Sequence, residues 1–368
     1  MNYLIPFLIL ITIVVFIHEY GHYYFAKKFG VGITDFSIGF GKEIFGWKDK
    51  FGTRWKICWI PLGGYVKFFG DRNVFSQAEQ KSIINKYNEE DREKLFILKP
   101  IYQRALIVAA GPLANFILAI FIFLFINMFV GKDITPAIIE EVLKDSPASI
   151  AGFEKNDKIL FIDDNKVESI LEVSTFINTS AEDIIKFIIL RKDEQISLFV
   201  KPDLVDSEDS LGNSAKRKMI GIKLSSSDRK FNKQRMSPSK AFYYSIKEVW
   251  FVSTTSLSYL GQMITGSADS SQLGGPIRIA KITGQVAEHG IIPFLSIMAY
   301  ISISLGLINL FPIPMLDGGH LLFYLLEKIK GRPLSQKTQE GFFRIGLFLL
   351  FSLMFFVTFN DLKDLGLF

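Results

Sequence analysis

Four long apolar runs alternate with charged segments along the chain, and this pattern predicts its architecture. The first run, from Leu4 to Phe25, has 22 residues. A helix of that length is about 33 Å long, enough to cross a hydrocarbon core about 30 Å thick. We therefore expect a polytopic α-helical membrane protein with four transmembrane helices, within residues 1–30, 104–130, 291–316 and 341–360.

The segment between the first two spans, residues 31–103, has a different pattern. Aromatic and β-branched residues surround a polar turn, so residues 44–48 and 54–60 are expected to form a membrane-associated β-hairpin. The charged stretch 71–100 is expected to form a surface helix, on the cytoplasmic side of the membrane like the hairpin. Two interpretations of the hairpin remain open: it offers a sheet edge to an extended peptide, or its aromatic side chains only form an interfacial belt.

Residues 131–205 contain short apolar runs separated by turns, which predicts an α+β domain. The Ser146-Pro147-Ala148 and Ala151-Gly152-Phe153 turns, together with these runs, are similar to the pattern of a PDZ domain, a fold that binds an extended peptide along a sheet edge. The runs expected to be strands are Ile138 to Leu143, Lys158 to Ile162, Asp183 to Leu190 and Gln195 to Val200.

Residues 206–290 are expected to form a linker with one short strand near Met219 to Leu224, an amphipathic helix and a loop. The helix, Ala241 to Gly266, is long enough to span a membrane but carries Lys247 and Glu248. We expect it to lie on the external surface of the membrane, because a further span would reverse the orientation of all later segments. The sequence leaves open whether this helix also enters the membrane.

Charge sets the expected orientation of these spans. Lys27 and Lys28 follow the first span, and Lys328 and Lys330 follow the third, so both positions are expected on the cytoplasmic side. The N-terminus, the C-terminus and the PDZ-like domain then lie outside. The sequence pI is near 9.0, but the basic residues are dispersed along loops, and we find no nucleic-acid motif.

The first span contains the motif with the clearest chemistry. His18 and His22 are two of only four histidines, and they flank Glu19 in a His-Glu-x-x-His pattern within an apolar run. Residues four apart share one face of a helix, so both imidazoles can bind one Zn²⁺ while Glu19 acts as a general base. The single cysteine, Cys58, excludes a cysteine-rich zinc site.

A catalytic zinc site needs a third protein ligand, which leaves one position for water. Asp317 is the best candidate, because it is the one acid attached to a span that prolines interrupt. His320 is the alternative ligand, or a hydrogen-bonding partner of a ligand. Asn115, a lone amide within the second span, has two open interpretations: close helix packing, or a role toward the substrate or the metal region.

The chain resembles the site-2 protease family of intramembrane zinc metalloproteases (peptidase family M50), and within it the bacterial regulator-of-sigma-E proteases. The resemblance runs nearly from end to end and rests on His18-Glu19-Tyr20-Gly21-His22, Gly111-Pro112-Leu113-Ala114-Asn115, Asn309-Leu310-Phe311-Pro312-Ile313-Pro314 and Leu316-Asp317-Gly318-Gly319-His320. It implies His18, His22 and Asp317 as ligands of a Zn²⁺ cofactor and Glu19 as the catalytic base. It also implies substrate-binding roles for Asn309, Pro312, Pro314 and, within a β-element of residues 36–66, Gly63 and Gly64. Well-known relatives carry two PDZ domains in tandem, whereas this sequence has room for one.

These features predict an intramembrane zinc metalloendopeptidase in the inner membrane of a bacterial cell. The resemblance implies membrane-spanning protein substrates, either anti-sigma factors or remnant signal peptides, and thus a role in sigma factor regulation. Two alternatives remain: a membrane metal transporter or sensor that uses the same His and Asp residues, or a membrane-anchored PDZ adaptor with a vestigial site. A transporter would need further ionisable groups along a pathway, and an adaptor would be expected to have lost Glu19.

Overall fold

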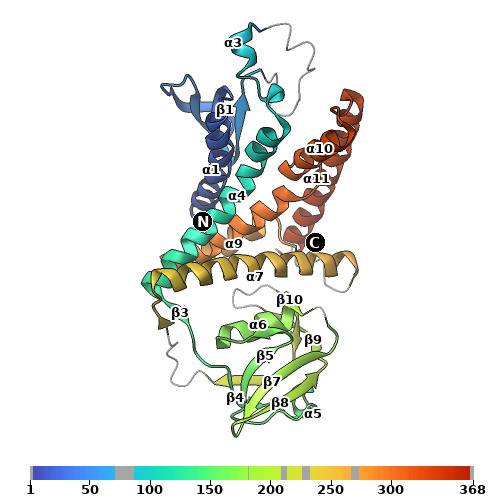
Figure 1. The fold of residues 1–368 in the computed structure, drawn as a ribbon. Helices are drawn as coiled ribbons and strands as arrows, with labels where there is room; N and C mark the ends of the chain where they lie inside the picture. The colour runs from blue at the N-terminus through green and yellow to red at the C-terminus, as the bar shows by residue number, and fades with distance from the viewer. Residues whose placement is uncertain are drawn as a thin grey trace. The chain divides into compact units, whose positions relative to one another are not determined.

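The computed structural model describes residues 3–70, 87–180, 182–208, 214–225, 233–266 and 273–364. The chain forms two compact units (Figure 1). Unit 1 comprises residues 1–122 and 274–362, and unit 2 comprises residues 123–273 and 363–368.

Within these described ranges, four helices are long and apolar enough to cross a membrane, which confirms the predicted number of apolar helices. They are α1 (Leu4–Lys28), α4 (Ile101–Phe125, continued by the π-helical turn Ile126–Val130), α9 (Ile291–Leu310) and α11 (Gln336–Asp364). The third is shorter than the expected 291–316, because Phe311 adopts an extended conformation before Pro312. The fourth is longer than the expected 341–360.

Two segments of unit 1 that were expected to be loops are helices. The first, α8 (Pro276–Glu288), begins where Asp361 of α11 accepts hydrogen bonds from the backbone N–H groups of Gly275, Ile277 and Arg278. The second, α10 (Asp317–Lys330), lies in the predicted cytoplasmic loop 317–340. Both helices are amphipathic, so their sequences lack the continuous apolar run from which the spans were predicted.

A buried ion pair connects α10 to α4 within unit 1. Arg104 donates two hydrogen bonds to the Glu327 carboxylate, at 3.1 and 2.7 Å. The guanidinium group of Arg104 also lies over the Tyr324 ring, 4.9 Å from its centre. Planar, bidentate contacts of this kind fix the relative orientation of two groups, so the helix that begins at Asp317 is held against α4.

The predicted hairpin is present as β1 (Ile33–Lys48) and β2 (Arg54–Phe68), which pair antiparallel and are longer than expected. Residues 35–38 of β1 pair with both 54–57 and 64–67, so β2 folds back along both edges of this part of β1. Residues 71–86 of the expected surface helix lie outside the described residues. The described remainder of that stretch forms only the short helices α3 (Glu89–Arg92) and η1 (Phe96–Leu98).

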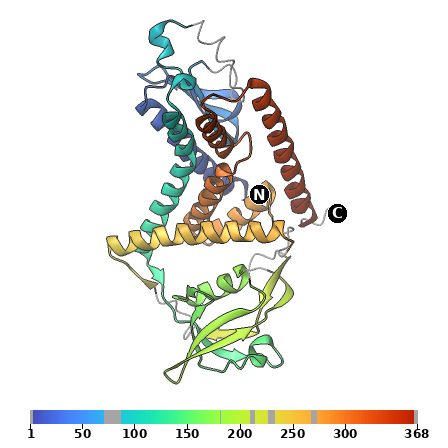
Figure 2. The same cartoon turned by 45° about the vertical axis from the view of Figure 1, so that its right-hand side comes forward.

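Unit 2 contains an α+β domain, whose strands are drawn in green and yellow-green in Figure 2. Its strand order is β11-β4-β5-β7-β8, with the short strand β6 beside β5. Apolar side chains of the sheet and of α6 form its core, including Ile139, Ile159, Phe187 and Ile189, which are at most 1% exposed. The strands are β4 (Ile138–Val142), β5 (Lys158–Ile162), β6 (Asn165–Lys166), β7 (Ile185–Arg191), β8 (Glu194–Val200) and β11 (Ile222–Ser225); the helices are α5 (Pro147–Ile150) and α6 (Ile170–Thr179).

The four expected strands are present, but the domain does not end at residue 205 as expected. A hairpin of β9 (Asp203–Glu208) and β10 (Ser214–Met219) follows, and β11 then returns to pair with β4. Strand β11 overlaps the short strand predicted near Met219 to Leu224. Its pairing with the distant β4 has no local signal in the sequence.

The predicted amphipathic helix is α7 (Pro238–Ile264), which is not among the four candidate spans. Its exposed apolar side chains recur on one face: Phe242, Ile246, Trp250, Leu257 and Ile264. Two further strands, β3 (Lys132–Asp133) and β12 (Lys233–Gln234), pair just before it and connect it to the end of the second apolar helix.

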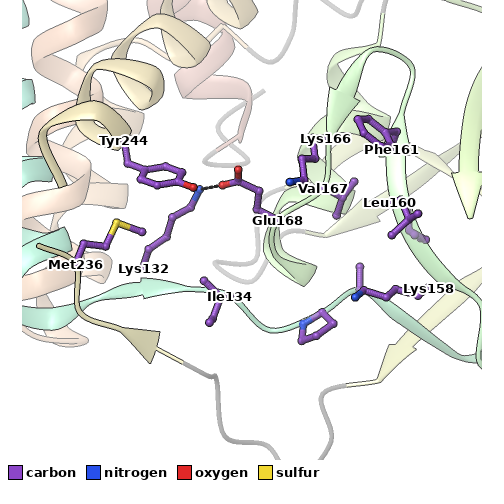
Figure 3. A pocket seen from close by; sticks show the side chains of 13 residues that line it. Lys132, Ile134, Lys158, Leu160, Phe161, Lys166, Val167, Glu168, Met236 and Tyr244 are labelled. Carbon is purple, nitrogen blue, oxygen red and sulfur yellow. Dashed lines mark hydrogen bonds and ion pairs between the residues drawn. The ribbon is translucent and has the colours of Figure 1, made fainter. Parts of the chain in front are cut away.

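An ion-pair cluster holds α7 against the α+β domain (Figure 3). Lys132 lies 2.6 Å from a Glu168 carboxylate oxygen and 4.6 Å from the centre of the Tyr244 ring of α7. Lys247 of α7 also bonds to Glu168, at 3.2 Å. Although burial opposes its charge, Lys132 has a raised pKa because of the neighbouring Glu168, and Glu168 has a lowered pKa because of Lys132. The cluster forms one wall of a cavity of about 430 Å³.

Candidate metal centre

Three potential metal ligands meet in unit 1. His18 and His22 lie one turn apart on α1 and are 7% and 9% exposed. His18 Nε2 lies 3.2 Å from His22 Nε2 and 3.2 Å from Asp317 Oδ2, while His22 Nε2 lies 3.5 Å from the same oxygen. Within the described parts of the chain, this is the one cluster of three or more such side chains suited to a metal ion.

The turn between α9 and α10 places Asp317 at this point. Two prolines prevent α9 from continuing, and Met315 has a positive φ of 93°, which allows the chain to reverse. Gly318 and Gly319 then pack against backbone carbonyls of residues 310, 311 and 313 so closely that a Cβ atom would overlap them. Asp317 is therefore the first residue of a new helix, rather than the end of a broken span as the sequence predicted.

Backbone packing of α4 against α1 leaves space for the two imidazoles. A Cβ atom at Gly111 would overlap Nε2 of His22 and come within 2.9 Å of Nε2 of His18. A Cβ atom at Gly21, between the histidines, would likewise overlap the carbonyl oxygen of Ala110. Both glycines permit the close helix contact that small residues give in membrane proteins.

Partners on α4 orient the rings of both histidines. His22 Nδ1 lies 2.9 Å from the Ile107 carbonyl oxygen, which can only accept, so Nδ1 carries a proton and Nε2 is the nitrogen that can bind a metal ion. His18 Nδ1 lies 3.3 Å from the side-chain amide of Asn115. The interpretation of Asn115 as a residue near the metal region thus matches its position.

Glu19 lies beside the cluster and against the hairpin. Its carboxylate accepts a hydrogen bond from the Val66 backbone N–H. A Cβ atom at Gly64 would lie 3.1 Å from Cγ of Glu19 and 3.2 Å from Val15. The glycine at position 64 therefore allows β2 to approach α1 at the position of the expected base.

The other predicted site residues are not members of the three-ligand cluster. Gly63 has a positive φ of 137° and packs against Phe40 of β1. Asn309 is in the last turn of α9, and Pro312 and Pro314 are in the turn that leads to Asp317. His320 is not part of the three-ligand cluster; its ring lies 5.8 Å from that of Phe343, and burial lowers its pKa.

The geometry of the cluster fits a zinc ion. Three ligand atoms held tetrahedrally at about 2.0–2.1 Å from zinc would be separated by about 3.3 Å, close to the distances between the three atoms here. Asp317 Oδ2 is buried and has no hydrogen-bond donor among the described residues. Lone pairs that face one another across so short a distance repel unless a proton or a cation lies between them.

The sequence did not reveal every functional group at this centre. The Ile107 carbonyl and the Val66 N–H are backbone groups, so no side-chain pattern marks them. Gly111 does belong to the quoted Gly-Pro-Leu-Ala-Asn motif, and its missing side chain was the available signal.

Comparisons with known proteins place the chain among zinc metalloproteases. The profile described as Peptidase family M50 matches residues 6–353. A relative from Agrobacterium fabrum, provisionally named a zinc metalloprotease, is 40% identical over 99% of this chain and 96% of its own length. The metalloprotease MmpA of Caulobacter vibrioides is 35% identical over 99% of this chain and 96% of its own length. Among solved structures, the PDZ domain of an SdrC-like protein from Listeria monocytogenes is similar over 25% of this chain and 90% of its own, with 23% identity and a TM-score of 0.20.

Proposed function

The chain belongs to peptidase family M50 and is a zinc metalloprotease, and on that premise we propose that it hydrolyses peptide bonds within or beside the transmembrane segments of other proteins. The observation that supports the proposal is the cluster of His18, His22 and Asp317 beside Glu19. The two histidines and Glu19 lie on α1, which is long and apolar enough to cross a membrane.

In this proposal, His18 Nε2, His22 Nε2 and a carboxylate oxygen of Asp317 hold the zinc ion. Zinc at such a site acts as a Lewis acid, which polarises a carbonyl group and acidifies water. Glu19 takes the proton from the attacking water and passes it to the leaving amine. Val66 donates its N–H to the Glu19 carboxylate and so helps to hold that side chain beside β2.

A transmembrane substrate hides its amide groups in helical hydrogen bonds, so it must unwind before hydrolysis. We place the unwound segment beside β2 at Gly63 and Gly64, where backbone groups of a strand can replace the lost bonds. The contact of Gly64 with Glu19 supports this placement. Asn309, Pro312 and Pro314 are assigned to the opposite side of the bound segment, because they lead directly to Asp317.

The proposed substrates are single-span membrane proteins of the anti-sigma factor or remnant signal peptide type. The lipid bilayer is the second partner. We place α7 on the external surface of this membrane. It has an exposed apolar stripe, and Asn127, at the end of the second apolar helix, donates a hydrogen bond to Ser245 of α7. The PDZ-like domain would act before cleavage, by excluding substrates with bulky external domains.

Cleavage should depend on zinc. The test is the protein in detergent with a purified single-span substrate, before and after metal removal by a chelator. We expect cleavage to stop on chelation and to return with about one equivalent of Zn²⁺, because a single cluster binds the ion. A transporter or sensor would bind zinc without cleaving the substrate at any zinc concentration, and that result would exclude the proposed function.

The proposed location is the bacterial inner membrane, with the N-terminus, C-terminus and PDZ-like domain extracytoplasmic. Cysteine labelling tests this orientation in a Cys58→Ser background. Ile150 is 83% exposed in the α+β domain, and Lys330 ends α10. A membrane-impermeant maleimide added outside should label Ile150→Cys and not Lys330→Cys; labelling of both from the same side would contradict the orientation.

A further inference from the structure

Asn115 has an unusual environment for an amide in a membrane helix. It is fully buried in α4, with 0% exposure. Its Nδ2 lies 3.3 Å from Nδ1 of His18, while its Oδ1 is buried and has no hydrogen-bond partner among the described residues. A buried amide oxygen without a donor carries a desolvation cost that nothing repays. This orphaned oxygen is the starting point of the inference.

We propose that Asn115 is a positioning residue for the metal centre, with its side-chain oxygen accepting a hydrogen bond from Nδ1–H of His18. The two ends of an amide have the same shape, so a rotation of 180° exchanges them without disturbing the packing. With Nδ2 toward His18, Nδ1 of His18 must be the acceptor and the proton must sit on Nε2. With Oδ1 toward His18, the proton sits on Nδ1 and Nε2 has a free lone pair.

The second orientation satisfies two independent requirements. It gives the orphaned oxygen a donor, and it gives His18 the tautomer that a metal ligand bound through Nε2 must have. The first orientation would direct the Nε2 proton of His18 toward His22 and Asp317 and leave Oδ1 unsatisfied. The same rotation therefore resolves the hydrogen bonding and prepares the ligand.

The backbone around Asn115 is fixed, so the amide is held at a defined distance from His18. The Asn115 carbonyl accepts a hydrogen bond from Ser302 of α9 at 2.9 Å, and Ser302 is also 0% exposed. One turn earlier, the Pro112 carbonyl lies against Gly306 of α9. These contacts lock this part of α4 between α9 and α1.

One face of α4 thus serves both histidines. Ile107, Gly111 and Asn115 are spaced four residues apart and lie on one side of the helix. Ile107 accepts from His22 and Gly111 makes room for both rings. Asn115 lies beside His18 and, in the proposed orientation, accepts from it. The order is reversed relative to α1, as expected for two antiparallel helices. In this interpretation, the motif from Gly111 to Asn115 makes room for the two histidine ligands and orients the ring of His18.

The test compares zinc affinities of the full-length protein in detergent, by competition with a chromophoric chelator. Asn115→Leu keeps the volume and removes the acceptor, whereas Asn115→Asp keeps an acceptor oxygen. We expect the leucine variant to bind zinc about 10- to 100-fold more weakly, the usual effect of losing such a partner. The aspartate variant should stay within about threefold of the parent. Asn127→Leu, the same substitution at the end of this apolar helix, is the matched control and should bind zinc as the parent does.

Two results would overturn the proposal: equal zinc affinity in Asn115→Leu and the parent, or an equal loss in Asn115→Leu and Asn115→Asp. If the leucine variant does not fold, Asn115→Ala removes the same acceptor without adding bulk and replaces it in the comparison. All variants are made in Glu19→Gln protein, so that self-cleavage plays no part. The inference rests on zinc binding by His18 and is tested without cleavage, so a failure of the proposed protease function would be seen separately.

Discussion

Replacing Glu19 with glutamine is expected to reduce cleavage of a single-span substrate by about 10³-fold, because a general base contributes about 10²–10⁴-fold and glutamine cannot take up a proton. The substitution preserves shape, and the glutamine side-chain oxygen can still accept the hydrogen bond from Val66. The hairpin should therefore stay in place, and zinc content should match that of the parent protein. Cleavage rate and bound zinc are measured on the same preparation.

Glu140→Gln is a suitable control for this substitution. Glu140 is an exposed residue of β4 in unit 2, outside the metal centre, so its replacement should leave both cleavage and zinc content unchanged. Unchanged cleavage in Glu19→Gln would remove Glu19 as the base. A loss of zinc in that variant would instead show that Glu19 contributes to metal binding, which contradicts its assignment as a general base alone.

The apolar spans and the histidine pair could be predicted because their signals are local. A run of uncharged residues specifies a membrane-spanning helix by length alone, and a spacing of four places His18 and His22 on one helix face. Asp317 could be found because prolines interrupt the span that precedes it. Each of these inferences needs only residues that are close in sequence.

The elements that could not be predicted depend on partners distant in sequence. The start of α8 is stabilised by Asp361, which lies more than 80 residues later. A short strand was predicted where β11 lies, but its pairing with β4, again about 80 residues away in sequence, was not. Amphipathic helices and four-residue strands have weak intrinsic preferences, and tertiary contacts decide their structure.

The fine structure of the metal centre was the least predictable part. The histidine motif specifies which residues can bind zinc, but the tautomer of each imidazole depends on what lies beside its other nitrogen. For His22 that group is a backbone carbonyl of α4, and for His18 it is the Asn115 amide. The sequence marked Asn115 only as an amide in an apolar span, with close helix packing as the other explanation.

Removing the Asp317 carboxylate should have the second large effect. If four ligands share an apparent zinc-binding free energy of about 10–16 kcal/mol roughly equally, one ligand contributes about 3 kcal/mol, so Asp317→Ala should bind zinc about 10²- to 10³-fold more weakly. The purified variant should contain less than one equivalent of zinc and cleave no substrate at low zinc concentration. Metal content by mass spectrometry and affinity by chelator competition measure the two effects.

Asp361→Ala separates loss of a ligand from loss of structure. Asp361 is 2% exposed and accepts backbone hydrogen bonds at the start of α8, so its removal should lower the stability of unit 1 by about 1–2 kcal/mol, as for other helix caps. Its zinc content should equal that of the parent. If Asp317→Ala also kept the zinc content of the parent, Asp317 would not be a ligand, and His320, three residues later on the first turn of α10, would become the candidate to test.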